Sequence, residues 1–223
     1  MTTTYEAADL EGSEMVLERE GTEVCIRVGH RTLMSSDVHD SEDELGRIIA
    51  QAVTDVATPH VLIGGLGLGF TLRAALDGLP ADARVDVAEL VPAVVRWNRE
   101  DCGDYSGRPL DDERTTLFVE DVAAVIARSE NTYDAIALDV DNGPSAVTHP
   151  RNEQLYKRAG LARAYAALRA GGVLAVWSSF PSDTFTKALE DLGGAVELVE
   201  TTLGLGSPQH YIWLARKPDA PDE

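Results

Sequence analysis

Short apolar segments alternate with helix-like segments over most of the chain, and this alternation constrains the fold more than any other feature. The apolar segments are Val61–Ile63, Val85–Leu90, Thr115–Val119, Ala135–Asp139 and Val173–Trp177. The helix-like segments that follow them are Thr71–Leu76, Pro92–Arg99, Val122–Ser129, Asn152–Leu168 and Ser182–Leu192. Strands separated by helices favour a parallel sheet, because each new strand is reached by a crossover connection over one face of the sheet. The pattern predicts an α/β fold with a doubly wound, mostly parallel, Rossmann-like sheet.

The N-terminal part of the chain departs from this alternation. Two strand-like runs flank Gly29 within Thr22–Ser35 and indicate a small β-hairpin. Ser41 and Glu44 then have the spacing of a capping box in front of an apolar run. We therefore expect a helix to begin at Ser41.

The C-terminal part contains two strand-like segments, Ala195–Thr201 and His210–Arg216, with no helix between them. Consecutive strands without a crossover helix pair as antiparallel neighbours, so we expect a β-hairpin at one edge of the sheet. The expected division of the chain is a small N-terminal β-hairpin region at 1–40, an α/β domain at 41–217 and a loose tail at 218–223.

An excess of acidic residues excludes several classes of partner. The chain has 38 Asp and Glu residues against 19 Lys and Arg residues, which gives a formal net charge of −19. This charge repels nucleic acid phosphates and anionic headgroups, so we expect no nucleic acid and no membrane partner. Cys25 and Cys102 have no CxxC spacing, the histidines have no metal-ligand spacing, and no signal peptide pattern or apolar stretch of about 18 residues occurs. We expect a cytoplasmic protein without a metal site.

A glycine-rich turn joins an apolar run to a helix-like segment in Val61–Thr71, with the sequence VLIGGLGLGFT. A Walker A loop requires Lys at its end, but Phe70 follows Gly69 here. The dinucleotide fingerprint GxGxxG also fails, because Phe70 occupies its third glycine position. The remaining pattern is GxGxG at Gly65, Gly67 and Gly69, which lets a ligand approach the backbone at the start of a helix.

Acidic residues follow the next three predicted strands. Glu89 ends the second strand, where a carboxylate can accept hydrogen bonds from both ribose hydroxyls. Asp121 follows the third strand, where it can accept from an exocyclic purine amine, and Asp139 ends the fourth. Each acid alone is typical of a helix N-cap or a solvated loop. Together with the glycine turn, the three predict a nucleoside-binding site at the carboxyl edge of the sheet.

These segments resemble the class I S-adenosylmethionine-binding fold, and within it the spermidine synthase family. The resemblance covers roughly Thr22–Ser178. Its segments are VLIGGLGLGFTLRAAL, DVAELVPAVV, FVEDVAAVI, YDAIALDVDNGP and NEQLYKR with LRAGGVLAVWS. Ile63 also fits, because ordinary methyltransferases usually carry an acid at this position and polyamine synthases an apolar residue.

The resemblance implies roles for the candidate site residues. The residues implied to bind S-adenosylmethionine or decarboxylated S-adenosylmethionine are Gly65, Gly67, Gly69, Glu89 and Asp121. Glu89 would hold the ribose, Asp121 the adenine, and Asp139 would lie beside the reacting sulfonium. A small-molecule acceptor and a homodimer are also implied.

The chain departs from the family pattern at positions that contact the transferred group and the acceptor. Spermidine synthases have an acid at the position of Leu68, which holds the amino end of the transferred group. They have another at the position of Asn142, where it positions and deprotonates the attacking amine. Asp141 is a neighbouring substitute, so Asp139 and Asp141 are the expected catalytic carboxylates. The family's Tyr-x-Glu segment in the first helix is also missing.

Three hypotheses follow. The first is a spermidine synthase-like transferase that moves a methyl or other alkyl group from S-adenosylmethionine or a close analogue to a small-molecule acceptor. The loss of the acid at Leu68 favours this hypothesis over aminopropyl transfer. The second is an aminopropyltransferase of polyamine biosynthesis that uses decarboxylated S-adenosylmethionine. The third is a non-catalytic nucleoside-binding protein.

Overall fold

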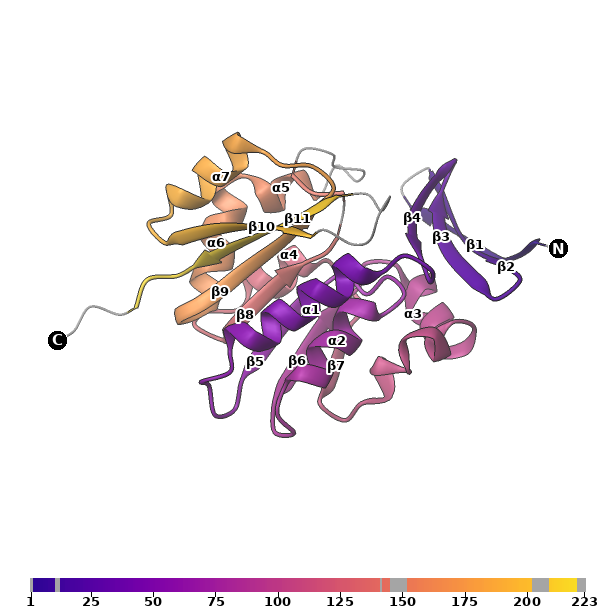
Figure 1. Ribbon diagram of the computed structural model, residues 1–223, viewed down its shortest axis with the longest axis horizontal. Coiled ribbons are helices and arrows are strands. Elements are labelled where there is room, and N and C mark those ends of the chain that lie inside the picture. Colours follow the sequence, from indigo (N-terminus) through magenta and orange to yellow (C-terminus); the bar gives the residue numbers. More distant parts are fainter. Residues whose placement is uncertain (1, 11–12, 141, 145–151, 202–208, 220–223) are drawn as a thin grey trace.

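Two β-sheets organise the chain in the computed structural model, which describes residues 2–10, 13–140, 142–144, 152–201 and 209–219 (Figure 1). The smaller sheet is antiparallel, with the order β1-β2-β3-β4. Its strands are β1 (Thr2–Leu10), β2 (Ser13–Glu20), β3 (Glu23–Val28) and β4 (Arg31–Ser35). The predicted hairpin is therefore half of a larger sheet. The alternation of buried Met15 and Leu17 along β2 is the period-two signal that sequence analysis passed over.

The larger sheet has the order β10-β11-β9-β8-β5-β6-β7. Its strands are β5 (His60–Gly64), β6 (Arg84–Ala88), β7 (Thr115–Phe118), β8 (Tyr133–Leu138), β9 (Leu168–Ser178), β10 (Ala195–Thr201) and β11 (His210–Arg216). Strands β5 to β9 pair in parallel, and β11 and β10 close one edge as an antiparallel hairpin. The predicted mostly parallel sheet and its C-terminal hairpin are confirmed. The chain builds β6 and β7 on one side of β5 and then returns to build β8 on the other.

Helices cover both faces of this sheet (Figure 1). They are α1 (Asp40–Ala52), α2 (Phe70–Gly78), α3 (Pro92–Glu100), α4 (Val122–Ala127), α5 (Glu153–Tyr156), α6 (Arg158–Ala167) and α7 (Asp183–Glu190), with short 3-10 helices at Gly103–Ser106 and Pro109–Asp111. Helices α1 to α3 share one hydrophobic cluster with the small sheet, and α4 to α7 belong to a second cluster. Within the described residues, no helix has the length and apolar character needed to cross a bilayer.

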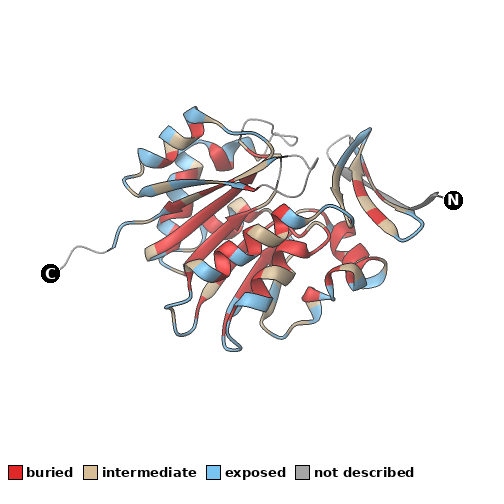
Figure 2. Cartoon of the chain, viewed as in Figure 1, coloured by how far each residue is buried: buried red, intermediate tan, exposed pale blue. Residues whose placement is uncertain are grey.

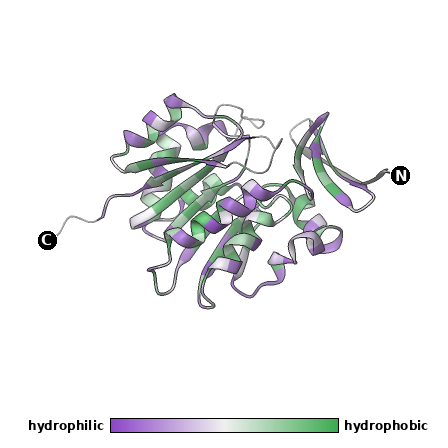
Figure 3. Cartoon of the chain, in the orientation of Figure 1, coloured by the Kyte–Doolittle hydropathy of each residue, from purple (hydrophilic) through white to green (hydrophobic). Residues whose placement is uncertain are grey.

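Side chains of the central strands alternate between these two clusters. Along β8, Ala135 and Ala137 face the first cluster, whereas Ile136 and Leu138 face the second. A strand covered by helices on both faces buries every residue, which explains why the predicted strands read as continuous apolar runs. Figures 2 and 3 show the same feature, with buried and hydrophobic residues concentrated in the central strands.

Helix α1 does not use the predicted capping box. It begins at Asp40 with His39 as its N-cap, and the amides of Glu42 and Asp43 donate to the His39 carbonyl. Ser41 therefore lies inside the first turn, where its hydroxyl donates to the Glu42 carboxylate at 2.5 Å. Both side chains are buried, so the serine hydroxyl holds a neighbouring carboxylate instead of capping the helix.

The predicted helix over Asn152–Leu168 is divided into α5 and α6. Lys157, between them, has extended backbone angles (φ −77°, ψ 157°). Gly160 packs against the backbone of α5 so closely that a Cβ atom would lie 2.1 Å from the Gln154 carbonyl oxygen. The break thus depends on a tight contact between the two helices.

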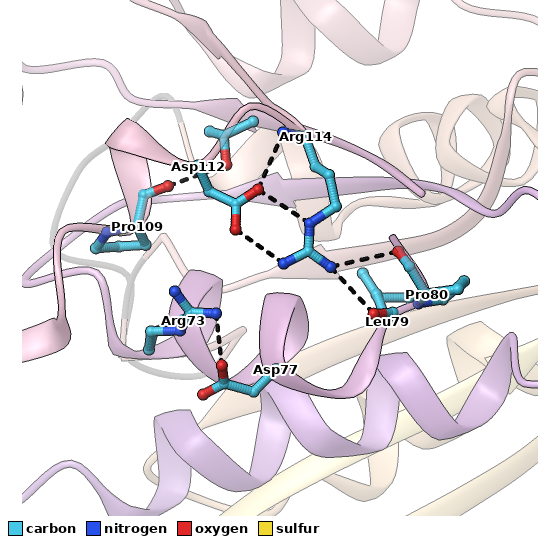
Figure 4. Close-up of polar contacts among 8 residues, drawn as sticks. Arg73, Asp77, Leu79, Pro80, Pro109, Asp112 and Arg114 are labelled. Carbon is cyan, nitrogen blue, oxygen red and sulfur yellow. Dashed lines mark hydrogen bonds and ion pairs between the residues drawn. The ribbon is translucent and has the colours of Figure 1, made fainter. Parts of the chain in front are cut away.

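A charged cluster fastens the start of β7 to the loop that follows α2 (Figure 4). The Arg114 guanidinium donates to both carboxylate oxygens of Asp112, at 2.9 and 2.8 Å. It also donates to the carbonyl oxygens of Leu79 at 3.0 Å and Pro80 at 3.3 Å. The hydrogen bonds that Arg114 donates to Asp112 lower the pKa of Asp112 to about 2.

We expect Asp112→Asn to reduce the free energy of unfolding at pH 7 by about 1–2 kcal/mol, because the ion pair with Arg114 is largely buried and bidentate. The folded-state pKa of Asp112 is depressed, so its contribution is present above about pH 4 and disappears as the pH falls toward 2. Urea titrations of wild type and variant at pH 7 and at low pH measure this difference.

Asp77→Asn is the matched control, because its pair with Arg73 is mostly exposed and should change stability by less than about 0.5 kcal/mol. An equal loss of stability in the two variants at pH 7 would contradict the role given to Asp112.

Candidate active site

A cavity lies at the carboxyl ends of β5, β6 and β8, with the small sheet as its opposite wall. Met15, Ile26 and Met34 line it from β2, β3 and β4, and Trp177 lines it from β9. The chain adds β6 and β7 on one side of β5 and β8 on the other, so the sheet has a topological switch point between β5 and β8. Open α/β sheets bind ligands at such points. Five of the predicted site residues line this cavity: Gly65, Gly67, Glu89, Asp121 and Asp139.

The glycine turn needs its glycines for two different reasons. Gly65 and Gly67 line the cavity with left-handed backbones (φ +93° and +52°). A Cβ atom on Gly65 would lie 2.1 Å from the Asp139 carbonyl oxygen. Gly69 is the N-cap of α2 and is not among the cavity-lining residues. Gly69 also has a left-handed backbone (φ +89°), and a Cβ atom there would lie 2.8 Å from the Ser106 hydroxyl oxygen, so the structure shows a packing constraint on Gly69 and its contact with a ligand stays a prediction.

Three side chains clamp the turn between its glycines. The Leu66 amide donates to Glu89 at 3.0 Å, and the Leu68 amide contacts the Met34 sulfur at 2.9 Å. The Asn98 amide group donates to the Gly67 carbonyl at 2.7 Å. The turn is thus fixed by strand β6, strand β4 and helix α3 before any ligand is bound. Leu68 itself is fully buried and is not among the cavity-lining residues.

Glu89 is 7% exposed and joins the turn to the end of β6. One carboxylate oxygen accepts from Leu66 and the other accepts from Val91 at 2.7 Å. Burial raises the pKa of Glu89, and these backbone amides oppose that change. Glu89 also lines the cavity, so its carboxylate lies where a ligand hydroxyl could meet it.

Asp121 combines the two interpretations open at the sequence level. It is the N-cap of α4, where its carboxylate accepts from the Ala123 amide at 2.8 Å. It also lines the cavity. Its cap hydrogen bond aligns the carboxylate at the cavity edge, so a structural and a ligand-binding role are compatible.

Asp139 follows β8 and accepts a hydrogen bond from the Thr71 hydroxyl at 2.8 Å. Burial raises its pKa to about 6, and the hydroxyl opposes that shift. The other predicted catalytic residue, Asp141, lies outside the described residues. Asn142, at the position where the family has an acid, lines the cavity.

Glu42 is a site residue that sequence analysis missed. It lines the cavity from the first turn of α1 and is 7% exposed. Burial, followed by repulsion from Asp139, raises its pKa to about 7. Sequence analysis assigns Ser41 and Glu44 to a capping box and gives Glu42 no role. Glu42 lies on the buried face of the helix together with Leu45 and Ile49. This helical spacing from Glu42 to the two apolar residues could have indicated that Glu42 is buried.

All charged side chains in the described lining of the cavity are acidic. Its lining contains Glu42, Glu89, Asp121 and Asp139, but no Lys, Arg or His among the described residues. No group of three His, Cys, Asp or Glu side chains in the described part of the chain is placed to hold a metal ion. The arrangement favours a cationic ligand, since an anionic one would meet only like charge.

We expect Glu42→Gln to stabilise the protein at pH 8 by on the order of 1–3 kcal/mol, because it removes a buried charge beside Asp139. The raised pKa means that the wild-type carboxyl stabilises the fold below about pH 4.5 and loses that contribution as the pH rises through about 7. Chemical denaturation at pH 5 and pH 8 tests this, with a smaller difference expected at pH 5. A variant less stable than wild type at pH 8 would rule out the proposed repulsion.

Sequence and structure comparisons agree on one group of proteins. No protein-family model matches the chain. Over 120 residues the chain is 34% identical to polyamine aminopropyltransferase 2 of Pseudomonas aeruginosa, a match that covers 52% of this chain and 32% of that protein. The matching segment thus spans about a third of the length of this curated relative.

Solved spermidine synthases have the same fold over nearly the whole chain. The enzyme from Thermotoga maritima superposes with a TM-score of 0.77 at 18% identity, covering 98% of this chain and 74% of that one. A spermidine synthase in complex with the transition-state analogue AdoDATO gives 0.76 at 17% identity, with 98% and 73% coverage. A probable spermidine synthase from Corynebacterium glutamicum gives 0.66 at 17% identity, with 97% and 80% coverage. The chain therefore has the spermidine synthase fold, of the class I S-adenosylmethionine-dependent methyltransferase type, and is a homologue of a polyamine aminopropyltransferase over about half of its length.

Proposed function

We propose that this protein is an aminopropyltransferase that takes decarboxylated S-adenosylmethionine as donor and a small alkylamine as acceptor. The observation that carries the proposal is the combination of a preformed glycine turn with an acidic cavity that has no basic side chain in its described lining. Decarboxylated S-adenosylmethionine carries a sulfonium and an ammonium group, whereas the intact compound adds a carboxylate that four acidic side chains would repel. The sequence relative named as an aminopropyltransferase supports the same choice.

The cavity residues suggest how the donor would be held. Gly65 and Gly67 line the cavity, so the donor would lie against the backbone of the turn, and Glu89 would accept from the ribose hydroxyls. Asp121, already aligned by its cap, would accept from the adenine amine. Asp139 would face the sulfonium end of the donor.

The reaction is a displacement at the carbon next to the sulfonium. The amine nitrogen forms the new C–N bond, the C–S bond breaks, and the electron pair passes to sulfur, which leaves as a neutral thioether. The attacking amine must lose a proton, so a carboxylate in the cavity has to accept it. Asp139 is suited to this step, because its pKa is raised to about 6. Alignment of amine and donor supplies the remaining catalytic effect.

Methyl or other alkyl transfer from intact S-adenosylmethionine is the second candidate. Leu68 and Asn142 favour it, because they replace two acids that the resemblance assigns to aminopropyl transfer. Product analysis with putrescine separates the candidates. Methylthioadenosine released from the decarboxylated donor supports the proposal, and S-adenosylhomocysteine released from the intact donor supports methyl transfer. Binding of donor and acceptor without either product would identify a non-catalytic nucleoside-binding protein.

We expect methylthioadenosine and decarboxylated S-adenosylmethionine to raise the thermal unfolding temperature, and NAD to leave it unchanged. A ligand at a hundredfold excess over its dissociation constant stabilises the folded state by about 2.7 kcal/mol, which gives a measurable shift. Differential scanning fluorimetry with the three compounds in parallel makes the comparison. A shift with NAD alone would show that the adenosyl-sulfur assignment is wrong.

We expect Glu89→Gln to weaken methylthioadenosine binding by about 1.5–3 kcal/mol, because a neutral amide replaces a charge-assisted acceptor. Calorimetric titration measures the effect. Glu113→Gln is the control, since Glu113 is exposed and lies outside the cavity lining. Equal methylthioadenosine affinity in wild type and Glu89→Gln would contradict a ligand-binding role for Glu89 and leave only its structural hydrogen bonds with Leu66 and Val91.

A further inference from the structure

Glu42 brings a carboxylate to the cavity from a helix that precedes the glycine turn in the chain. It is 7% exposed and lines the same cavity as Asp139. The Ser41 hydroxyl donates to Glu42 at 2.5 Å, and the Thr71 hydroxyl donates to Asp139 at 2.8 Å. Each carboxylate is therefore held by a hydroxyl from a helix, and within the described residues neither forms an ion pair with a basic side chain.

We propose that Glu42 and Asp139 form one subsite for a primary ammonium group, and that Glu42 makes the cavity select alkylammonium ligands over ligands that carry a carboxylate. The inference rests on the proposed function, because it assigns one substrate group to the same cavity. Both proposed substrates carry such a group. In decarboxylated S-adenosylmethionine it ends the aminopropyl arm, and in the acceptor it is the amine itself. The chemistry of recognition is the same for both.

The charges around the pair favour this occupant. Glu89 and Asp121 are the other titratable groups that line the cavity, and Asp43 lies next to Glu42 on α1. None of these can neutralise the pair, and the rest of the described lining consists of apolar residues such as Met34 and Trp177, glycines and two asparagines, with no basic side chain. Two carboxyls in such surroundings resist being ionised together. An ammonium between them supplies the missing positive charge, whereas a ligand carboxylate would add to the repulsion.

Proton release follows from the same geometry. Burial and mutual repulsion raise the pKa of Glu42 to about 7 and burial raises that of Asp139 to about 6, so the free pair retains a proton for part of the time near neutral pH. An ammonium favours the fully ionised pair, and the proton then passes to solvent. Cation binding should therefore strengthen from pH 6 to pH 8. Methylthioadenosine, which has neither sulfonium nor ammonium, should show no such change.

The test is calorimetric titration of wild type, Glu42→Gln and Glu44→Gln at pH 6 and pH 8, in two buffers with different ionisation enthalpies. The probes are methylthioadenosine, decarboxylated and intact S-adenosylmethionine, and putrescine, which is added both to the free protein and to the methylthioadenosine complex. Glu44 is the matched control, because it lies on the same helix but is half-exposed and paired with Arg47 at 2.9 Å.

We expect Glu42→Gln to weaken a cationic ligand by about 10- to 100-fold and to abolish its proton release, while methylthioadenosine affinity stays the same. Glu44→Gln should behave as wild type. A loss confined to the decarboxylated donor places the aminopropyl arm at the subsite, and a loss confined to putrescine places the acceptor amine there. Asp139→Asn is the second variant if Glu42→Gln fails to fold, and it should show the same pattern.

Two results separate failure of this inference from failure of the proposed function. Unchanged methylthioadenosine and unchanged cation affinity in Glu42→Gln would overturn the ammonium subsite and leave the adenosyl site intact. A wild type that binds putrescine through Glu42 but binds no adenosyl ligand would overturn the proposed function and keep the subsite.

Discussion

The position of β5 at the centre of the large sheet is the constraint on which the rest of the site depends. The chain extends the sheet from β5 through β6 to β7, and then returns to place β8 on the other side. The helices that follow these strands, α2 after β5 and α6 after β8, consequently pack in different hydrophobic clusters on opposite faces, and a crevice forms where the sheet changes direction. Gly65 and Asp139 lie at this point, and the Asp139 amide donates to the Gly64 carbonyl at 2.8 Å.

The small N-terminal sheet converts this crevice into a cavity. Met15, Ile26 and Met34 supply an apolar wall opposite the carboxyl ends of the strands, and the Met34 sulfur contacts the Leu68 amide. The same sheet shares a hydrophobic cluster with α1, α2 and α3, so its position is coupled to the glycine turn by packing. A ligand in the cavity would contact both sheets, which excludes water from one side of the reacting groups.

The charge of the cavity distinguishes this protein from a generic nucleotide-binding domain. Phosphate-binding sites of this fold type present backbone amides and basic groups to an anion. Here the amides of Leu66 and Val91 are satisfied by Glu89, and the charged side chains of the described lining are all carboxylates. Glu42 and Asp139 add charge where burial makes it costly, a cost that a cationic substrate would offset.

The sequence by itself determined the architecture and most of the site. Alternating apolar and helix-like segments require a parallel sheet, and all carboxyl ends of parallel strands meet at one edge, so Gly65, Gly67, Glu89, Asp121 and Asp139 had to lie near one another. Local pattern could not place Glu42, because its position in the same cavity as Asp139 depends on α1 packing against α2 and β8. It could not separate Gly69 from its neighbouring glycines, because only the fold brings Ser106 against it. Spacing along the chain fixes which residues share a strand end, whereas packing between distant segments decides which other side chains reach them.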